Sequence, residues 1–159
     1  MNKVSFRAEA GKVTAILGPN QAERRTLTDL LGERRKYGSF DGNVIANGIK
    51  AGVAYRDCVA FVPRESLYTP GLTYYEMMFY GAQLRMSGDP LIANCSSAEA
   101  AYRIEGRVND ILALMGLNRV KHRLIDERPV QRGELGGDLR KLSIAMEIIA
   151  LPPIIVLDD

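Results

Sequence analysis

The feature that most constrains the fold is an apolar run that ends in a turn and is followed by a helical pattern. Residues 13–17 form the run, Gly18-Pro19-Asn20 breaks it, and residues 26–31 have helical spacing before Gly32. A strand that leads through a loop into a helix is the local setting of a phosphate-binding loop. The sequence therefore predicts an α/β fold in which this loop opens the first helix.

The rest of the chain alternates between strand-like and helix-like segments. Further strands are expected at 4–6, 58–62 and 154–157, and helices at 72–84, 97–115 and 142–150. Glycines punctuate residues 38–52, which predicts a small N-terminal β-meander with tight turns. The alternation indicates one α/β domain over 1–159, with a core of 1–85 and 141–159 and an inserted helical subdomain of 86–140. Because the chain stops on a strand, we expect the sheet to be incomplete at the C-terminus.

Composition and charge narrow the possible functions. The net charge is +2, so neither nucleic acid nor an anionic membrane is an expected partner. The basic residues at 33–36 and 139–141 are expected on solvated faces. Cys58 and Cys95 lack metal spacing and indicate a reducing compartment, and the single His122 cannot form a zinc site. The apolar stretch 144–157 is interrupted and too short to span a bilayer, so the isolated chain is expected to be soluble.

The loop after the first apolar run occupies the position of a Walker A motif. That motif requires a glycine, four residues, Gly-Lys and then a serine or threonine. The residues found there are Gly18, Pro19, Asn20, Gln21, Ala22, Glu23, Arg24, Arg25 and Thr26. Taken alone, this stretch does not satisfy the pattern.

Several segments together resemble a known family in their order and spacing. They are residues 11–19, 38–42, 61–63, 72–73, 84–86, 132–133, 140–147 and 154–158. In this order they resemble the nucleotide-binding domain of G-subfamily ABC transporters, the White and pleiotropic-drug-resistance type. The run 141–147 is specific to that family, and the resemblance covers almost the whole chain.

The resemblance implies a P-loop NTPase-like ABC ATPase core that uses ATP and Mg²⁺. It also implies a head-to-tail dimer with a second nucleotide-binding domain, and a transmembrane domain as partner at the cytoplasmic face of a membrane. In that setting water attacks the γ-phosphate, and positioning and charge neutralisation supply most of the catalysis.

The Walker A loop departs from the family pattern at consecutive positions. Glu23 replaces a glycine that lets backbone N–H groups close on the phosphates. Arg24 replaces the phosphate-binding lysine and keeps its charge, but its planar fork is not a compact ammonium. Arg25 replaces the hydroxyl residue that ligates Mg²⁺, which puts a cation where a cation binds. Thr26 keeps a hydroxyl, but one position later and on another helix face.

The Q-loop and the signature motif are altered as well. Arg64 stands where the family has a metal-sensing glutamine. Glu134, Leu135, Gly136, Gly137 and Asp138 stand in the place of the signature motif. Leu135 removes the serine hydroxyl that contacts a γ-phosphate across the dimer. The two glycines remain, and they are compatible either with a close approach to phosphate or with a turn that starts a helix.

The Walker B strand is the best-preserved motif. Residues 154–157 are apolar and end at Asp158, the inferred Mg²⁺ ligand. Asp159 lies where the catalytic glutamate belongs, and its side chain is one methylene shorter. Because a general base must lie within hydrogen-bond reach of its water, this shortening is expected to lower the rate.

Two functional hypotheses from different classes follow. In the first, the chain is an ATPase module that couples ATP binding and hydrolysis to transport, with impaired hydrolysis. In the second, it is a non-hydrolytic degenerate half-site, a scaffold or a decayed fragment without nucleotide binding. The altered motifs favour the second as a description of activity, and the family pattern favours the first as a description of ancestry.

Overall fold

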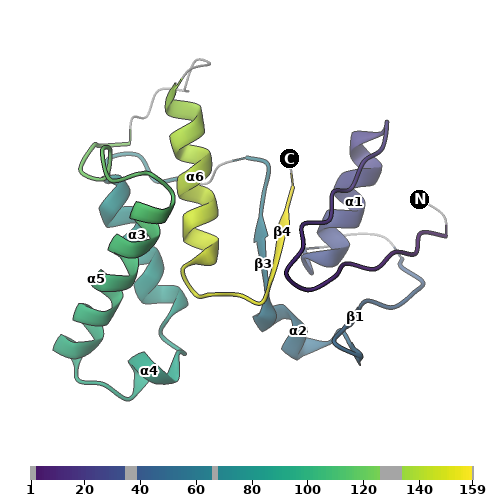
Figure 1. Cartoon of the computed structure of the whole chain (residues 1–159), viewed down its shortest axis with the longest axis horizontal. Coiled ribbons are helices and arrows are strands. Elements are labelled where there is room, and N and C mark those ends of the chain that lie inside the picture. The colour runs from purple at the N-terminus through teal and green to yellow at the C-terminus, as the bar shows by residue number, and fades with distance from the viewer. Residues whose placement is uncertain (1–2, 35–38, 66–67, 126–133, 159) are drawn as a thin grey trace.

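Figure 1 shows a computed structural model of the chain, in which residues 3–34, 39–65, 68–125 and 134–158 are described. A helical block lies on one side, a pair of strands in the middle, and the first helix on the other side. The elements are α1 (Gln21–Leu31), β1 (Ile45–Ala46), β2 (Ile49–Lys50), α2 (Val53–Cys58), β3 (Val59–Val62), α3 (Tyr74–Arg85), α4 (Pro90–Ala93), α5 (Ser97–Leu114), α6 (Glu134–Ile148) and β4 (Ile154–Leu157).

The central strand pair joins two segments that are far apart in the sequence. β3 and β4 run parallel, in a register that pairs Val59 with Ile154 and Val62 with Leu157. The N–H of Asp158 donates to the carbonyl of Val62 at 3.0 Å, which extends the ladder by one residue. Parallel strands end at the same edge, so the residues that follow β3 and β4 lie side by side there. This edge positions the candidate site.

The largest hydrophobic core lies in the helical block. Side chains of α3, α5 and α6 meet there, and Figure 1 shows these helices packed together. Its most buried members are Tyr74, Met78, Ala82, Met86, Val108, Leu112, Leu117, Leu142, Ala145 and Ile149. Met77 and Met78 of α3 are both buried in this core. The division of the chain at residues 86 and 140 stays a prediction.

The two N-terminal strands are not formed, which corrects the sequence prediction. Residues 4–6 and 13–17 belong to neither of the two sheets found among the described residues. Val13 is fully exposed and Leu17 is 89% exposed. A strand needs a hydrogen-bonded neighbour, and β4 pairs with β3 alone within the described part of the chain. Residues 13–17 therefore have the composition of a strand but pair with no strand in the described part of the chain.

Two further boundaries differ from expectation. The predicted meander is reduced to one hairpin, in which β1 and β2 pair antiparallel over two residues each. The last helix begins at Glu134 rather than at Leu142, so it includes the glycines of the signature segment. Glycine disfavours helix interiors by about 1 kcal/mol, and for that reason the sequence pattern placed the start too late. Burial of Leu139 shows that the apolar stripe extends into this earlier part.

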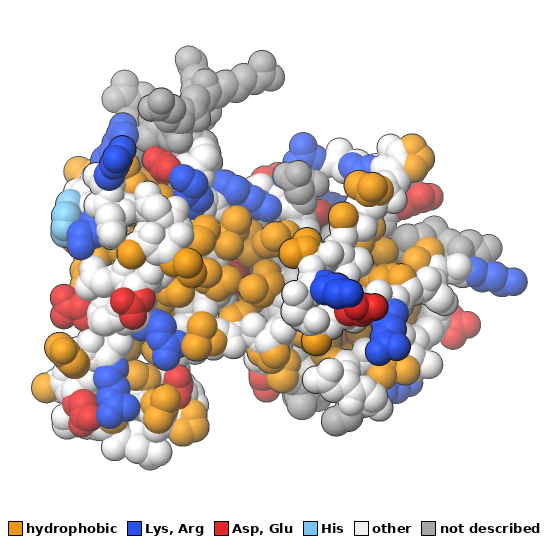
Figure 2. Space-filling model, viewed as in Figure 1, with side chains coloured by type: hydrophobic (Ala, Val, Ile, Leu, Met, Phe, Trp, Pro, Cys, Tyr) orange, Lys and Arg blue, Asp and Glu red, His pale blue; other side chains and the backbone are white. Residues whose placement is uncertain are grey.

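Hydrophobic side chains also gather on the surface. Figure 2 shows them near the centre of the displayed face, over the region of α6 and the strand pair. Ile155 and Leu157 of β4 are each about half exposed. The face displayed in Figure 2 therefore carries clustered apolar side chains and not only isolated ones.

The start of α3 is fixed by a capping box. The Thr73 hydroxyl accepts from the N–H of Glu76 at 3.1 Å, and the Glu76 carboxylate accepts from the N–H of Thr73 at 2.8 Å. The hydrogen bonds from Thr73 lower the pKa of Glu76 below its ordinary value. The two residues satisfy backbone donors that an uncapped helix leaves without partners.

We expect Thr73→Ala to lower the free energy of unfolding by about 1 kcal/mol, because it removes the cap of α3. Urea denaturation followed by circular dichroism measures the loss. Thr69→Ala is the control, because Thr69 is exposed and lies outside the helix. Equal stability of the two variants would show that the capping box does not hold the helix start.

Candidate functional site

The loop from Gly18 leads into α1 through a side-chain cap. The Asn20 carboxamide oxygen accepts from the N–H of Ala22 at 3.0 Å, and the N–H of Arg24 donates to the carbonyl of Asn20 at 3.2 Å. Asparagine is among the best residues for this role, since its side chain reaches the second residue of the helix. The Ala22 N–H at the start of α1 is therefore engaged within the chain itself.

Glu23 and Arg24 follow this cap in the first turn of α1 and carry opposite charges. Glu23 is exposed in the first turn of α1 and brings a negative charge there. The guanidinium of Arg24, through Nη1, donates to the carbonyl of Gly18. Arg24 thus closes the loop on itself, because its guanidinium is held by the backbone of the loop.

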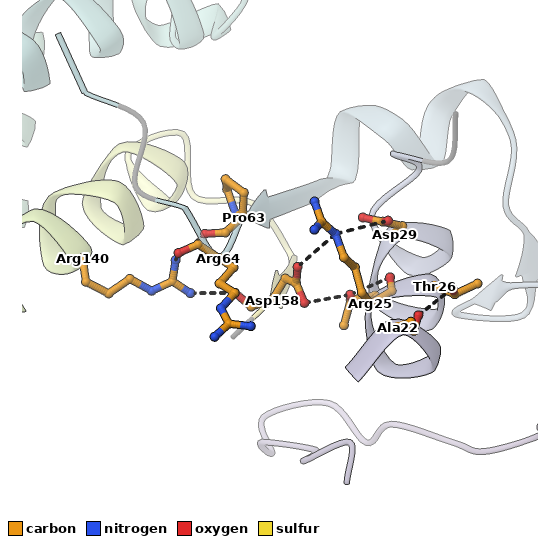
Figure 3. Close-up of polar contacts among 9 residues, drawn as sticks. Ala22, Arg25, Thr26, Asp29, Pro63, Arg64, Arg140 and Asp158 are labelled. Atoms are coloured by element: carbon orange, nitrogen blue, oxygen red, sulfur yellow. Dashed lines mark hydrogen bonds and ion pairs between the residues drawn. The ribbon is translucent and has the colours of Figure 1, made fainter. Parts of the chain in front are cut away.

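Arg25 contacts the carboxylate that ends the Walker B strand. Its Nε lies 3.9 Å from Oδ2 of Asp158 and 4.0 Å from Oδ2 of Asp29, one turn further along α1 (Figure 3). The hydroxyl of Thr28 lies 3.3 Å from the other oxygen of Asp158, Oδ1. The Asp158 side chain is only 10% exposed, whereas that of Arg25 is 64% exposed. Both oxygens of a nearly buried carboxylate are therefore engaged by α1.

The hydroxyl of Thr26 does not take over the role of the missing metal ligand. It donates to the carbonyl of Ala22 at 2.7 Å, within the same helix. Figure 3 shows Thr26 on the side of α1 away from Asp158. The prediction that a shift of one position moves the hydroxyl to another helix face is confirmed.

These residues do not fit a Mg²⁺ ion. Magnesium requires near-octahedral oxygen ligands at about 2.0–2.1 Å and is held through one or two carboxylates. Here one Asp158 oxygen faces a guanidinium, and the candidate hydroxyl of Thr26 is turned away. The described residues contain no group of three His, Cys, Asp or Glu side chains able to hold a metal. Asp159, the predicted general base, lies outside the described residues.

A second arginine ties the helical block to the end of the strand pair. Arg140 of α6 donates through Nη2 to the carbonyl of Asp158 at 2.9 Å. Through Nη1 it donates to the carbonyl of Pro63 and, at 3.3 Å, to that of Arg64 (Figure 3). The expectation that Arg140 lies on a solvated face is wrong, because its fork spans the ends of both strands. The local sequence does not indicate this role, because the three carbonyl acceptors belong to segments outside α6.

The remaining predicted site residues are Arg64 and those of the signature segment. Arg64 is exposed, and its described contact is the one that its carbonyl makes. The Asp138 carboxylate lies 3.6 Å from Nζ of Lys141 within α6, and a Cβ on Gly137 would have nothing within 4 Å. Figure 1 shows the start of α6 on the opposite side of the strands from α1. The placement of the Leu135 side chain and the surroundings of Gly136 lie outside what the structure describes.

The chain matches known proteins along its whole length. The ABC transporter family profile matches residues 1–159. Among solved structures, the fold matches that of cbiO1 from Clostridium perfringens, described as part of the ABC transporter complex cbiONQ. The TM-score is 0.69 at 20% identity, over 97% of this chain and 56% of that one. The predicted ABC ATPase fold is thereby confirmed.

The similar curated proteins are much longer than this chain. The ABC-type transporter claG of Penicillium crustosum is 33% identical over 151 residues, which is 94% of this chain and 19% of that protein. ABC transporter G family member 12 of Dictyostelium discoideum is 28% identical over all of this chain and 24% of its own length. ABC transporter G family member STR of Petunia hybrida is 29% identical over all of this chain and 18% of its own length. The chain therefore belongs to the ABC transporter family, as nucleotide-binding-domain sequence of the G-subfamily type.

Proposed function

We propose that this chain serves as a non-hydrolytic half-site of an ABC transporter, which binds nucleotide weakly and does not hydrolyse it. The observation that carries the proposal is the contact between Arg25 and Asp158. The residue that replaces the metal-binding hydroxyl pairs with the carboxylate expected to hold the metal. The altered residue and the carboxylate expected to hold the metal are thus joined in one ion pair.

The state of the loop supports the same proposal. A phosphate-binding loop works by directing backbone N–H groups and one flexible cation at the phosphate oxygens. In this chain, the Asn20 side chain engages the N–H of Ala22, and Arg24 binds the carbonyl of Gly18. The negative charge of Glu23 lies beside the place a polyanion would enter. A nucleotide therefore has to displace internal contacts before it binds.

The partners proposed are those of the family. A half-site requires a second nucleotide-binding domain to complete a head-to-tail dimer. It also requires a transmembrane domain to which the dimer is coupled. We place the site at the cytoplasmic face of a membrane on the same reasoning. None of the described helices has the length and apolar character needed to cross a bilayer. The half-exposed side chains of Ile155 and Leu157 are compatible with contact to further polypeptide.

A second candidate function is a scaffold that binds no nucleotide. The engagement of both Arg24 and the Ala22 N–H within the loop favours it, since both groups would otherwise face phosphate. The two candidates differ in one measurable property, the affinity for ATP.

Reversal of the three loop changes tests the proposal. We expect Glu23→Gly, Arg24→Lys, Arg25→Thr to raise the affinity for Mg-ATP by at least about tenfold, because one regained charge-assisted contact contributes about 1.5–3 kcal/mol. Isothermal titration calorimetry on the original and reversed chains measures the gain. Thermal unfolding of both verifies that each is folded.

The control adds Asp158→Asn to the reversed chain. This variant should lose most of the gained affinity if the reversal restored a metal site at Asp158. Tight Mg-ATP binding by the original chain would contradict a silenced half-site. Complete lack of ATP binding by the folded original chain, with or without metal, would favour the scaffold.

A further inference from the structure

We propose that the guanidinium of Arg25 takes the place of the divalent cation in this site, so that the polyphosphate it accepts is metal-free. This inference rests on the proposed weak nucleotide binding and specifies its ligand. Arg25 lies between two carboxylates, with Nε 3.9 Å from Asp158 and 4.0 Å from Asp29. The positive charge needed beside the nearly buried Asp158 is thus supplied by the protein.

The positive charge of Arg25 disfavours a metal ion at Asp158. The charge of Arg25 already lies beside Asp158, where a metal ion would bind. The Oδ2 atom of Asp158 faces that charge, and Oδ1 lies 3.3 Å from the hydroxyl of Thr28. A second cation at Oδ2 would meet direct repulsion from Arg25. Mg²⁺ therefore competes with Arg25 for the same carboxylate.

The exposed part of Arg25 is suited to a phosphate. A guanidinium has five N–H donors in a fork, and that fork matches two oxygens of a phosphate group. Among the residues that the structure describes, both ion pairs of Arg25 use Nε, and Nη1 and Nη2 have no partner. The side chain is 64% exposed. The terminal donors can thus bind an anion while Nε remains beside Asp158.

The consequence is that the affinity for ATP should depend on Mg²⁺ in the opposite direction to that of a Mg²⁺-dependent site. In a Mg²⁺-dependent site, a chelator removes an essential part of the ligand and weakens binding. In this chain, Mg²⁺ bound to ATP would cover the phosphate oxygens that Arg25 contacts and bring a cation against it. Removing the metal should therefore leave binding unchanged or strengthen it.

The experiment compares ATP binding in EDTA and in excess Mg²⁺ by calorimetry. The original chain should bind ATP at least as tightly in EDTA as in Mg²⁺. Arg25→Thr should show the opposite order, with ATP binding weakened by about tenfold or more in EDTA. In parallel, electron paramagnetic resonance of Mn²⁺ should detect a protein-bound Mn²⁺–ATP species with Arg25→Thr and not with the original chain.

Arg24→Thr is the matched control, since it removes the same charge one position earlier on α1. It should weaken ATP binding in both conditions without making the binding depend on Mg²⁺, because Arg24 contacts Gly18 and not Asp158. Binding by the folded original chain only with Mg²⁺ would overturn this inference and leave nucleotide binding in place. Binding in neither condition would overturn the proposed nucleotide binding and this inference with it.

Discussion

Replacing Gly32 by alanine should lower the free energy of unfolding by about 1–3 kcal/mol, the usual cost of overpacking a filled core. Gly32 is the buried residue that ends α1. A Cβ built there would lie 3.0 Å from Cγ and 3.2 Å from Cβ of Phe61, and closer still to Cδ2 of the ring. Because the contact includes the Phe61 Cβ, rotation of the ring alone cannot relieve it. The backbone at Gly32 has a negative φ, so the loss comes from packing and not from backbone strain.

Urea denaturation of Gly32→Ala measures this loss, and Gly88→Ala is the matched control. Gly88 has open space where a Cβ would lie, and it too has no positive φ. A double variant that adds Phe61→Leu should recover part of the loss, because it removes the clashing ring. Similar stability of Gly32→Ala and Gly88→Ala would show that α1 and β3 are not in close contact. The packing of α1 onto the strands, which brings Arg25 to Asp158, would then be in doubt.

The segments that sequence could predict are those with a pattern of their own. Four such segments have an apolar run or an apolar spacing of their own, and their observed ends differ from the predicted ones by at most two residues. They are the strand at 58–62, the helices at 72–84 and 97–115, and the Walker B strand. Asp158 is identified as a site residue by the family resemblance, which implies a metal ligand directly after the Walker B strand.

The features that escaped prediction depend on distant partners. Residues 13–17 have the composition of a strand, but strand formation also requires a hydrogen-bonded neighbour, and none of the described strands pairs with them. Such choices among several possible partners are decided by tertiary geometry, which a residue's type and spacing do not contain.

Arg140 is the clearest example, and its replacement by alanine should be the most damaging change near the site. Its fork donates to the carbonyls of Pro63, Arg64 and Asp158. Alanine would leave these acceptors at the ends of β3 and β4 without their charged donor. Each such bond contributes about 1.5–3 kcal/mol, and solvent can replace part of it at this half-buried position. We therefore expect Arg140→Ala to lower the free energy of unfolding by about 2–4 kcal/mol.

Two companion variants separate geometry from charge. Arg140→Lys keeps the charge but not the fork, so it should recover less than half of the loss. Lys141→Ala removes a neighbouring charge whose described ion pair is an exposed one with Asp138, and it should cost less than about 1 kcal/mol. Full recovery by lysine would contradict a role for the fork. Equal losses at positions 140 and 141 would mean that the bridge between α6 and the strand ends does not hold the site together.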